Sequence, residues 1–332
     1  MTALIDGYDA VLFDLDGVVY LGPDPVDGAV DGIADLRERG TKIGFVTNNA
    51  ARTAASVADH LRRLGIACTC DDVVTSAQAA ARLLADRFPE RGRVLVVGTQ
   101  ALVQEVEQYG FTTTRSADDA PVAVVQGYDP QMSWPILAEA GFAIQAGAVW
   151  IATNTDPTRP TDRGLVPGNG AAVGALQTVS PVEPEIAGKP YRPLMEETIR
   201  RLDAGRPIFV GDRTDTDIAG ARSCGVDSLL VLCGAHRACD LLAAPPDQRP
   251  THLGQDLRAL LAPARTARLD GTPATGLTVR CGDEGAELID GRLTVYGTGL
   301  DGLWALAQLA WAAADRGESV DPGPALAALH VR

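Results

Sequence analysis

Short apolar runs alternate with amphipathic stretches along most of this chain, and this alternation limits the folds that it can adopt. Near the N-terminus, the run Ala10–Phe13 is followed by a helical pattern over Val26–Arg39 and by a second run over Lys42–Val46. The pattern returns at Pro207–Val210 and Asp227–Leu232. Because such alternation is typical of parallel strands joined by helices, it predicts an α/β fold built on a doubly wound parallel sheet.

A second α/β pattern lies between these two halves. Its strand-like and helical stretches alternate in the order Arg93–Val97, Gln100–Gln108, Val122–Val125, Pro135–Ala146 and Val149–Ala152. Since 332 residues exceed the usual reach of one hydrophobic core, we predict an inserted domain. The main domain then comprises residues 1–77 and 184–262, and the α/β insertion comprises residues 78–183.

The C-terminal segment, residues 263–332, has a different pattern. The stretch Ala262–Asp270 reads as a linker, and it is followed by predicted strands at Leu277–Cys281 and Arg292–Tyr296, with Asp290-Gly291 at a turn. A helical pattern completes the segment, which predicts a small α+β unit.

A glycine-rich stretch follows the last of these predicted strands. Gly297, Gly299 and Gly302 fit the spacing G-x-G-x-x-G, but too few residues follow to complete the βαβ unit of a dinucleotide site. We therefore expect the segment to serve packing or dimerisation, which leaves a homodimer open.

The net charge of −14 argues against nucleic-acid binding, which normally needs a basic face. The six cysteines include no C-x-x-C pair, so we expect reduced thiols in a cytoplasmic protein rather than disulfides or a zinc site. No basic N-terminal region precedes a long apolar run, and we expect neither a signal peptide nor membrane insertion.

Four polar clusters follow or flank predicted strand ends, where ligands bind in open α/β sheets. The first is Asp14-Leu15-Asp16-Gly17. Two carboxylates after an apolar strand are costly unless they hold a cation or take part in chemistry. Asp14 suits attack on phosphorus, Asp16 suits proton transfer, and Gly17 lets the backbone approach a phosphate. Taken alone, the pattern also fits a turn or a calcium-loop fragment.

The second and third clusters carry groups that suit an anion. In Thr47-Asn48-Asn49, a hydroxyl and backbone amides at a strand-to-helix turn can bind phosphate oxygens, although a helix N-cap is the simpler interpretation of that cluster alone. In Gly188-Lys189-Pro190, the lysine can neutralise a nucleophile and a phosphoryl group, although most lysines are solvated.

The fourth cluster runs from Gly211 to Ile218. Asp212, at a strand end, can bind Mg²⁺ together with Asp14, because Mg²⁺ takes oxygen ligands and keeps several waters. A helix is predicted from about Asp215 to Ser223, so Asp215 can also be a helix cap.

In this order, the four clusters resemble the signature of the haloacid dehalogenase superfamily over residues 1–262. The resemblance implies a Mg²⁺-dependent phosphatase that works through an aspartyl-phosphate. By position, it implies Asp14 as nucleophile, Asp16 as general acid and base, Thr47 as phosphate ligand and Lys189 as charge stabiliser. Metal contacts are implied for Asp14, the carbonyl of Asp16 and Asp212, with Asp217 orienting metal-bound water. The residues expected to contact substrate are Gly17, Thr47, Asn48, Asn49, Arg159 and Lys189.

The position of the insertion resembles the class IIA, NagD-like and p-nitrophenylphosphatase-like branch, in which such a domain is a cap that selects the substrate. The segments 154–160 and 167–170 match the cap signature. Arg159 stands where pyridoxal-phosphatase relatives carry a histidine, which weakens that assignment. The sequence is most similar to actinobacterial glycerol-3-phosphate phosphatases, so glycerol 3-phosphate is the expected substrate and Arg159 is expected to contact it.

Other functions stay open at this point. Phosphoglycolate, or a broad range of sugar and nucleotide monophosphates, are alternative substrates. A phosphate-ester-binding regulatory protein is an alternative of another class, and it is disfavoured because all four motif residues are intact.

Overall fold

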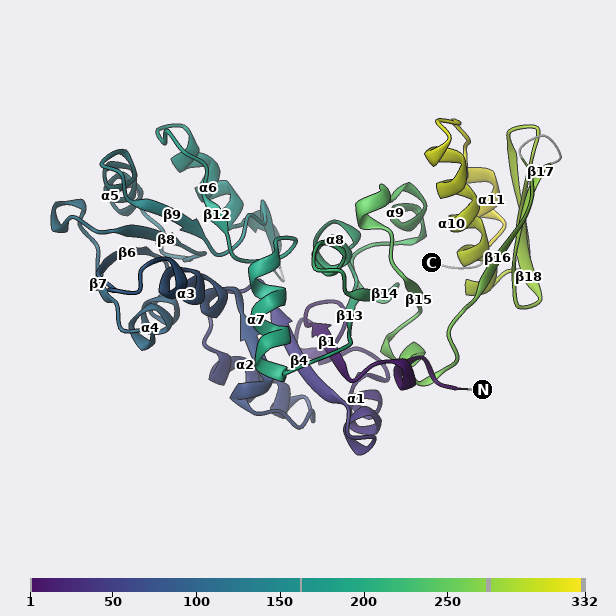
Figure 1. Cartoon of the computed structure of the whole chain (residues 1–332), viewed down its shortest axis with the longest axis horizontal. Coiled ribbons are helices and arrows are strands. Elements are labelled where there is room, and N and C mark those ends of the chain that lie inside the picture. The colour runs from purple at the N-terminus through teal and green to yellow at the C-terminus, as the bar shows by residue number, and fades with distance from the viewer. Residues whose placement is uncertain (1, 162, 273–275, 330–332) are drawn as a thin grey trace. The chain divides into compact units, whose positions relative to one another are not determined.

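The computed structural model describes residues 2–161, 163–272 and 276–329, and the chain divides into two compact units. The first unit is Met1–Lys42 with Gly205–Arg332, and the second is Ile43–Ala204. Figure 1 shows the elements of both units along the chain. The predicted limits of the main domain and its insertion stay a prediction, whereas the predicted α/β class is confirmed by the parallel sheets described below.

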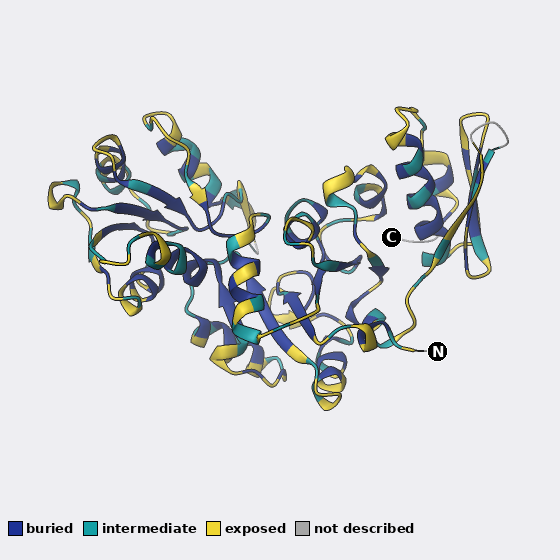
Figure 2. Cartoon of the chain, in the orientation of Figure 1, coloured by how far each residue is buried: buried dark blue, intermediate teal, exposed yellow. Residues whose placement is uncertain are grey.

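In the first unit, four parallel strands lie in the order β15-β14-β13-β1. They are β1 (Ala10–Asp14), β13 (Pro207–Gly211), β14 (Asp227–Val231) and β15 (His252–Gly254). Their residues are almost all buried, because a parallel sheet is covered on both faces and its strands are therefore apolar throughout. Figure 2 shows these strands as buried.

The helices and short elements of this part of the first unit connect and cover the strands. They are η1 (Leu4–Gly7), the hairpin of β2 (Tyr20–Leu21) and β3 (Asp24–Pro25), α1 (Ala29–Glu38), the π-helical turn η4 (Thr214–Ile218), α8 (Ala219–Ser223), α9 (Ala238–Ala243), η5 (Pro246–Gln248) and η6 (Leu257–Leu261).

Two of the predicted helices differ from the structure at their first turns. The helix predicted from Val26 begins at Ala29, because Gly28 has a left-handed φ of 74° and ends the extended chain before it. The helix predicted over Asp215–Ser223 is divided into the π-helical turn η4 and the α-helix α8.

The second unit contains its own five-stranded parallel sheet in the order β12-β9-β8-β6-β7. Its strands are β6 (Arg93–Val97), β7 (Thr112–Thr114), β8 (Ala123–Gln126), β9 (Val149–Ala152) and β12 (Glu185–Ile186). The five elements predicted for this region are all present. The buried indole of Trp150 lies in the core between this sheet and its helices.

The remaining elements of the second unit are the parallel pair β4 (Lys42–Thr47) and β5 (Val73–Thr75), the antiparallel hairpin β10 (Thr158–Thr161) and β11 (Gly164–Pro167), and the helical segments α2 (Ala54–Arg63), η2 (Cys70–Asp72), α3 (Ser76–Arg87), α4 (Gln100–Gln108), η3 (Ala117–Asp119), α5 (Trp134–Gln145), α6 (Asn169–Gln177) and α7 (Arg192–Leu202).

The C-terminal segment of the first unit is a four-stranded antiparallel sheet that packs on a helix. The strands are β16 (Ala267–Thr272), β17 (Gly276–Cys281), β18 (Glu284–Ile289) and β19 (Arg292–Tyr296), and the helices are α10 (Leu300–Asp315) and α11 (Gly323–Ala327). Both helices lie along one face of the sheet (Figure 1).

The prediction of two strands in this segment was incomplete. The strand β16 begins inside the stretch that was interpreted as a linker, and β18 pairs with both β17 and β19. Charged and small residues dominate β18, so its apolar alternation is weak and was missed. The turn at Asp290-Gly291 is confirmed, since it joins β18 to β19 with φ values of 50° and 73°.

Helix α10 joins the C-terminal segment to the parallel-sheet part of the same unit. Its buried side chains belong to one hydrophobic cluster with residues of β14, α9 and β15. The indole Nε1 of Trp311 donates a hydrogen bond to the carbonyl of Leu241 in α9, at 3.0 Å.

None of the helices within the described part of the chain has the length and apolar character that a membrane crossing requires.

The glycine-rich loop between β19 and α10 is occupied by a side chain of the same segment. The Glu284 carboxylate accepts hydrogen bonds from the amides of Thr298, Gly299 and Gly302, at 3.0, 3.0 and 2.6 Å. Burial acts to raise the pKa of Glu284, but these amides outweigh it and hold the pKa below its usual range. A carboxylate therefore lies where the phosphate of a dinucleotide would bind.

Candidate active site

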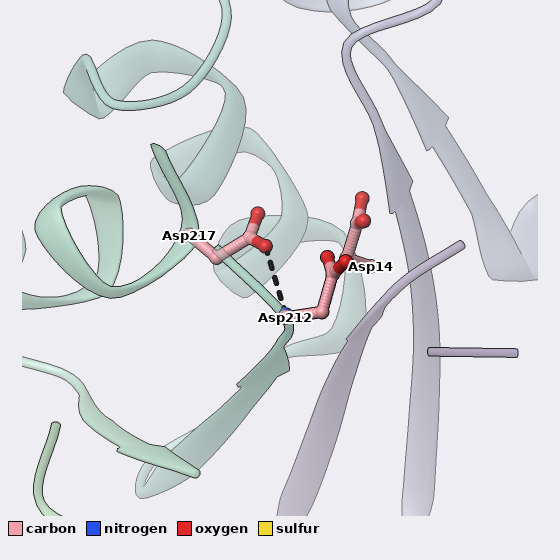
Figure 3. Close-up of side chains that lie close together, drawn as sticks. All are labelled: Asp14, Asp212 and Asp217. Carbon is pink, nitrogen blue, oxygen red and sulfur yellow. Dashed lines mark hydrogen bonds between the residues drawn. The ribbon is translucent and has the colours of Figure 1, made fainter. Parts of the chain in front are cut away.

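The side chains of Asp14 and Asp212 lie side by side because their strands are parallel neighbours. The register of β1 and β13 pairs Phe13 with Val210, so both strands end at the same edge of the sheet. Asp14 is the last residue of β1, and Asp212 directly follows β13. Figure 3 shows the two carboxylates together with that of Asp217 from η4.

These three aspartates form a cluster of oxygen donors. One carboxylate oxygen from each lies within 4.8 Å of the others, and Asp212 and Asp217 are buried. The Asp217 Oδ2 atom accepts hydrogen bonds from the amides of Asp212 and Arg213, both at 3.1 Å, and the first of these is the dashed line in Figure 3. Like charges this close favour a bound cation, and oxygen donors suit Mg²⁺.

Two glycines make room for the Asp212 carboxylate. A Cβ atom at Gly17 would lie 2.2 Å from Asp212 Oδ2, and a Cβ atom at Gly234 would lie 2.1 Å from it. Gly17 also has a left-handed φ of 93°, which other residues rarely adopt. The donor set and this glycine cradle therefore fit a small, oxygen-bound cation.

The loop after β14 contains site residues that the sequence analysis missed. The amide of Ala235 donates to Asp212 Oδ2 at 2.6 Å, and the amide of His236 donates to the Asp212 carbonyl at 3.2 Å. The His236 Nδ1 atom accepts a hydrogen bond from the amide of Thr214 at 3.0 Å. The signal that could have identified this loop is its position after the strand next to β13.

Cys233 and Asp215 border this cluster without offering reactive groups. The Cys233 thiol donates to the carbonyl of Gly17 at 3.2 Å. Burial, and to a smaller extent the negative charge of Asp212, raises the pKa of this thiol to about 12, so the thiol stays neutral. Burial acts to raise the pKa of Asp215, but two hydrogen bonds from Arg213, at 3.0 and 2.7 Å, outweigh it and lower that pKa.

In the second unit, Asn48 connects two of the predicted motifs. Its Oδ1 atom accepts from the amide of Lys189 at 2.8 Å, and its Nδ2 atom donates to the carbonyl of the same lysine at 3.1 Å. The Nδ2 atom also lies 3.3 Å from Asp156 Oδ2, and the Asn48 carbonyl accepts from the side chains of Ser76 and Asn154. The turn after β4 is thereby joined to the buried Lys189.

The other predicted residues of the second unit lie on two separate elements. Thr47 is buried at the end of β4, and its Oγ1 atom accepts from the amide of Asn49, whose own Oδ1 atom accepts from the amide of Ala51. Arg159 is exposed on the hairpin β10–β11, and its guanidinium lies over the ring of Tyr128, 5.3 Å from the centroid. Thr53, and not Thr47 or Asn49, caps the following helix α2.

Comparisons with known proteins match this chain over most of its length. Residues 11–112 match the model of the haloacid dehalogenase-like hydrolase family, and residues 186–260 match a second, HAD-hydrolase-like model. The chain is 50% identical over 260 residues to D-glycerol 3-phosphate phosphatase of Mycobacterium tuberculosis. This alignment covers 78% of this chain and 73% of that protein. It is 35% identical over 251 residues to the 5′-nucleotidase YutF of Bacillus subtilis, with 74% and 94% covered.

A solved structure is similar over nearly the whole chain. It is a glycerol phosphate phosphatase from Mycobacterium tuberculosis in complex with magnesium, with a TM-score of 0.82 and 42% identity. The match covers 94% of this chain and 93% of that one, so it includes the C-terminal segment.

Proposed function

Because this chain belongs to the haloacid dehalogenase-like hydrolase family, we propose that it is a Mg²⁺-dependent phosphatase with glycerol 3-phosphate as its substrate. The observation that carries the proposal is the cluster of Asp14, Asp212 and Asp217 at the carboxyl edge of the parallel sheet. The choice of substrate is supported by the relative that shares half of its aligned residues with this chain and is a D-glycerol 3-phosphate phosphatase.

The side chains of Asp14 and Asp212 and the backbone carbonyl of Asp16 would hold the Mg²⁺ ion. Asp217, whose carboxylate is fixed by two amides, would orient a water molecule on the ion. When bound, the ion supplies the positive charge that lets an anionic phosphate approach the anionic Asp14.

Asp14 is the proposed nucleophile and Asp16 the proposed acid and base. An Asp14 oxygen attacks the phosphorus, the bond between phosphorus and the glycerol oxygen breaks, and Asp16 gives that oxygen its proton. Asp16 then takes a proton from a water molecule, whose oxygen attacks the phosphorus. The bond to Asp14 breaks, inorganic phosphate leaves, and both aspartates return to their starting states.

Residues of the second unit are proposed to bind the substrate. Thr47 and Lys189 would contact the phosphate, with Asn48 holding Lys189 in place. The amides of Asn49 and of Gly17, the latter in the first unit, already donate to Thr47 Oγ1 and to the Tyr20 carbonyl. The proposed catalytic core is residues 1–77 and 184–262, and the proposed cap is residues 78–183. Arg159 would contact the glycerol hydroxyls from this cap, since its guanidinium offers five donors in a rigid fork.

A broader specificity is the second candidate. The relative that is 35% identical and carries the name 5′-nucleotidase supports hydrolysis of nucleoside monophosphates. Sugar phosphates and phosphoglycolate belong in the same test, because the proposed chemistry acts on the phosphate and leaves the choice of alcohol to the cap.

Release of inorganic phosphate from a substrate panel tests the proposal. The full chain with Mg²⁺ is assayed on glycerol 3-phosphate, phosphoglycolate, sugar phosphates, nucleoside monophosphates and p-nitrophenyl phosphate. We expect the highest kcat/KM for glycerol 3-phosphate. A higher value for a nucleotide would favour the broader enzyme, and no turnover of any substrate would favour a phosphate-ester-binding regulatory protein.

The nucleophile is tested by Asp14→Asn, with Asp118→Asn at an exposed position of η3 as the matched control. Loss of a nucleophile removes the route through the aspartyl-phosphate, so Asp14→Asn should reduce kcat by several powers of ten. Turnover of more than a few per cent of the wild-type value would require another nucleophile.

We also propose a cytoplasmic enzyme that forms a homodimer. All six cysteines lie within the described residues and none of them forms a disulfide, which supports a reducing compartment. The exposed Trp134 and Phe142 on α5 offer apolar surface for a second copy, and light scattering of the purified chain measures the resulting mass.

A further inference from the structure

His236 has no part in the proposed chemistry, yet it lies against the backbone that carries Asp212. The residue follows β14, and its side chain is 21% exposed. Its Nδ1 atom accepts from the amide of Thr214 at 3.0 Å and lies 3.1 Å from the Thr214 hydroxyl. Because Nδ1 accepts the amide proton, the neutral ring carries its own proton on Nε2. That nitrogen lies 3.7 Å from Asp215 Oδ1.

We propose that His236 is a positioning residue that holds the loop after β13 so that Asp212 points into the Mg²⁺ site. The inference rests on the proposed function, in which Asp212 is a metal ligand.

Three hydrogen bonds between the loop Gly234–His236 and the loop after β13 support this role. Two of them hold Asp212 itself, from the amide of Ala235 to its carboxylate and from the amide of His236 to its carbonyl. In the third bond, the His236 ring accepts from the amide of Thr214, which lies two residues after Asp212 and is 3% exposed. Without the ring, the buried amide of Thr214 would lose this acceptor, and a buried amide without an acceptor is costly.

The loop that carries His236 is itself held by a rigid support. Helix α9 begins at Ala238, two residues after His236, and the Trp311 indole from α10 bonds to its Leu241 carbonyl. A ring in a loop that leads directly into an anchored helix can hold a neighbouring loop in place. Partners that orient metal ligands in this way typically change metal affinity by about 10- to 100-fold when they are removed.

The test compares the Mg²⁺ dissociation constants of His236→Ala, His236→Asn and His236→Gln, measured by isothermal titration calorimetry without substrate. The amide oxygen of asparagine can take the place of Nδ1, whereas glutamine puts its oxygen near the place of Nε2. We expect Mg²⁺ binding to weaken by about tenfold in His236→Ala, to weaken similarly in His236→Gln and to stay close to wild type in His236→Asn.

A general loss of structure would not produce this order among the three variants. Far-ultraviolet circular dichroism and the unfolding midpoint without Mg²⁺ check the fold. His60→Ala, on α2 of the second unit, is the matched control and should bind Mg²⁺ like the wild type. If His236→Ala does not fold, the comparison of asparagine with glutamine decides the question. Equal Mg²⁺ binding by all three variants, or asparagine as weak as glutamine, would overturn the inference.

Asp212→Asn separates this inference from the proposed function. If Asp212→Asn leaves Mg²⁺ binding unchanged, the proposed metal site itself is wrong. If Asp212→Asn weakens binding strongly while His236→Ala does not, the metal site stands and the positioning role of His236 is wrong.

Discussion

Replacing Trp311 should destabilise the whole first unit and not the C-terminal segment alone. Trp311 is 6% exposed, and its ring meets that of Trp304 edge to face, with 5.6 Å between centroids. The Arg249 guanidinium lies 5.4 Å from the ring centroid and forms two hydrogen bonds with Asp315. The hydrophobic cluster around Trp311 includes side chains of β14, α9 and β15, so the sheet shares the packing that would be lost.

The size of the effect follows from what each substitution removes. Trp311→Ala takes away a buried indole and should lower the free energy of unfolding by about 3–5 kcal/mol. Trp311→Phe keeps an aromatic ring but removes the donor to the Leu241 carbonyl, which should cost about 1–2 kcal/mol. Leu165→Ala is the control, because that residue is 72% exposed and the change should stay within about 0.5 kcal/mol.

Native-state hydrogen exchange measured by mass spectrometry shows where stability is lost. In Trp311→Ala, we expect protection to fall together in peptides of α10, β14 and β15, since one hydrophobic cluster links these elements. Urea unfolding followed by circular dichroism gives the corresponding free energies. A loss of protection confined to residues 263–332, with β14 and β15 unchanged, would refute the reasoning and make the segment an independent domain.

Four further predictions concern the proposed site and the loops around it. Asn48→Ala should lower the free energy of unfolding by about 2–3 kcal/mol in urea, because its side chain bonds to both backbone groups of Lys189; an unchanged value would contradict that role. Glu284 has a lowered pKa in the folded state, so its charge stabilises the fold at neutral pH. The thermal midpoints of the wild type and of Glu284→Gln should therefore differ at pH 7. This difference should shrink as the pH falls below about 4.3, the pKa of a glutamate in the unfolded chain, and then through the lower pKa of Glu284 in the folded protein. Arg159→Ala should lower kcat/KM for glycerol 3-phosphate by about 10- to 100-fold and that for p-nitrophenyl phosphate much less, while equal losses would assign Arg159 to the phosphate or to cap closure. Chelation with EDTA should abolish turnover, Mg²⁺ should restore it and Ca²⁺ should restore it poorly, because the larger Ca²⁺ shell is less ordered; full activity after exhaustive chelation would exclude the metal site.

The sequence alone indicated much of the fold and the metal-binding half of the site. The runs Ala10–Phe13 and Pro207–Val210 are continuous and apolar, which identifies buried parallel strands. Asp14 follows the first run at once, and Asp212 follows the second after Gly211. Since parallel neighbours end at the same edge of a sheet, these local patterns suffice to place Asp14 beside Asp212.

Other features were decided by contacts between residues that lie far apart in the chain. Strand β18 carries little apolar alternation and is ordered by its two neighbours, and Glu284 reaches the glycine-rich loop across 15 residues. The glycine spacing alone resembles a dinucleotide-binding loop. The amides of this loop donate instead to the carboxylate of Glu284, which lies outside the motif.

The surroundings of Asp212 depended on the tertiary structure in the same way. His236 is an ordinary polar residue after a strand, and its role appears only when β13 and β14 pair and the two following loops meet. Gly234 looks like a loop glycine until the Asp212 carboxylate is seen to fill the space of its missing Cβ atom. Local periodicity determines strands and their ends, whereas the partner of a buried amide or carboxylate is determined by which loops the completed sheet brings together.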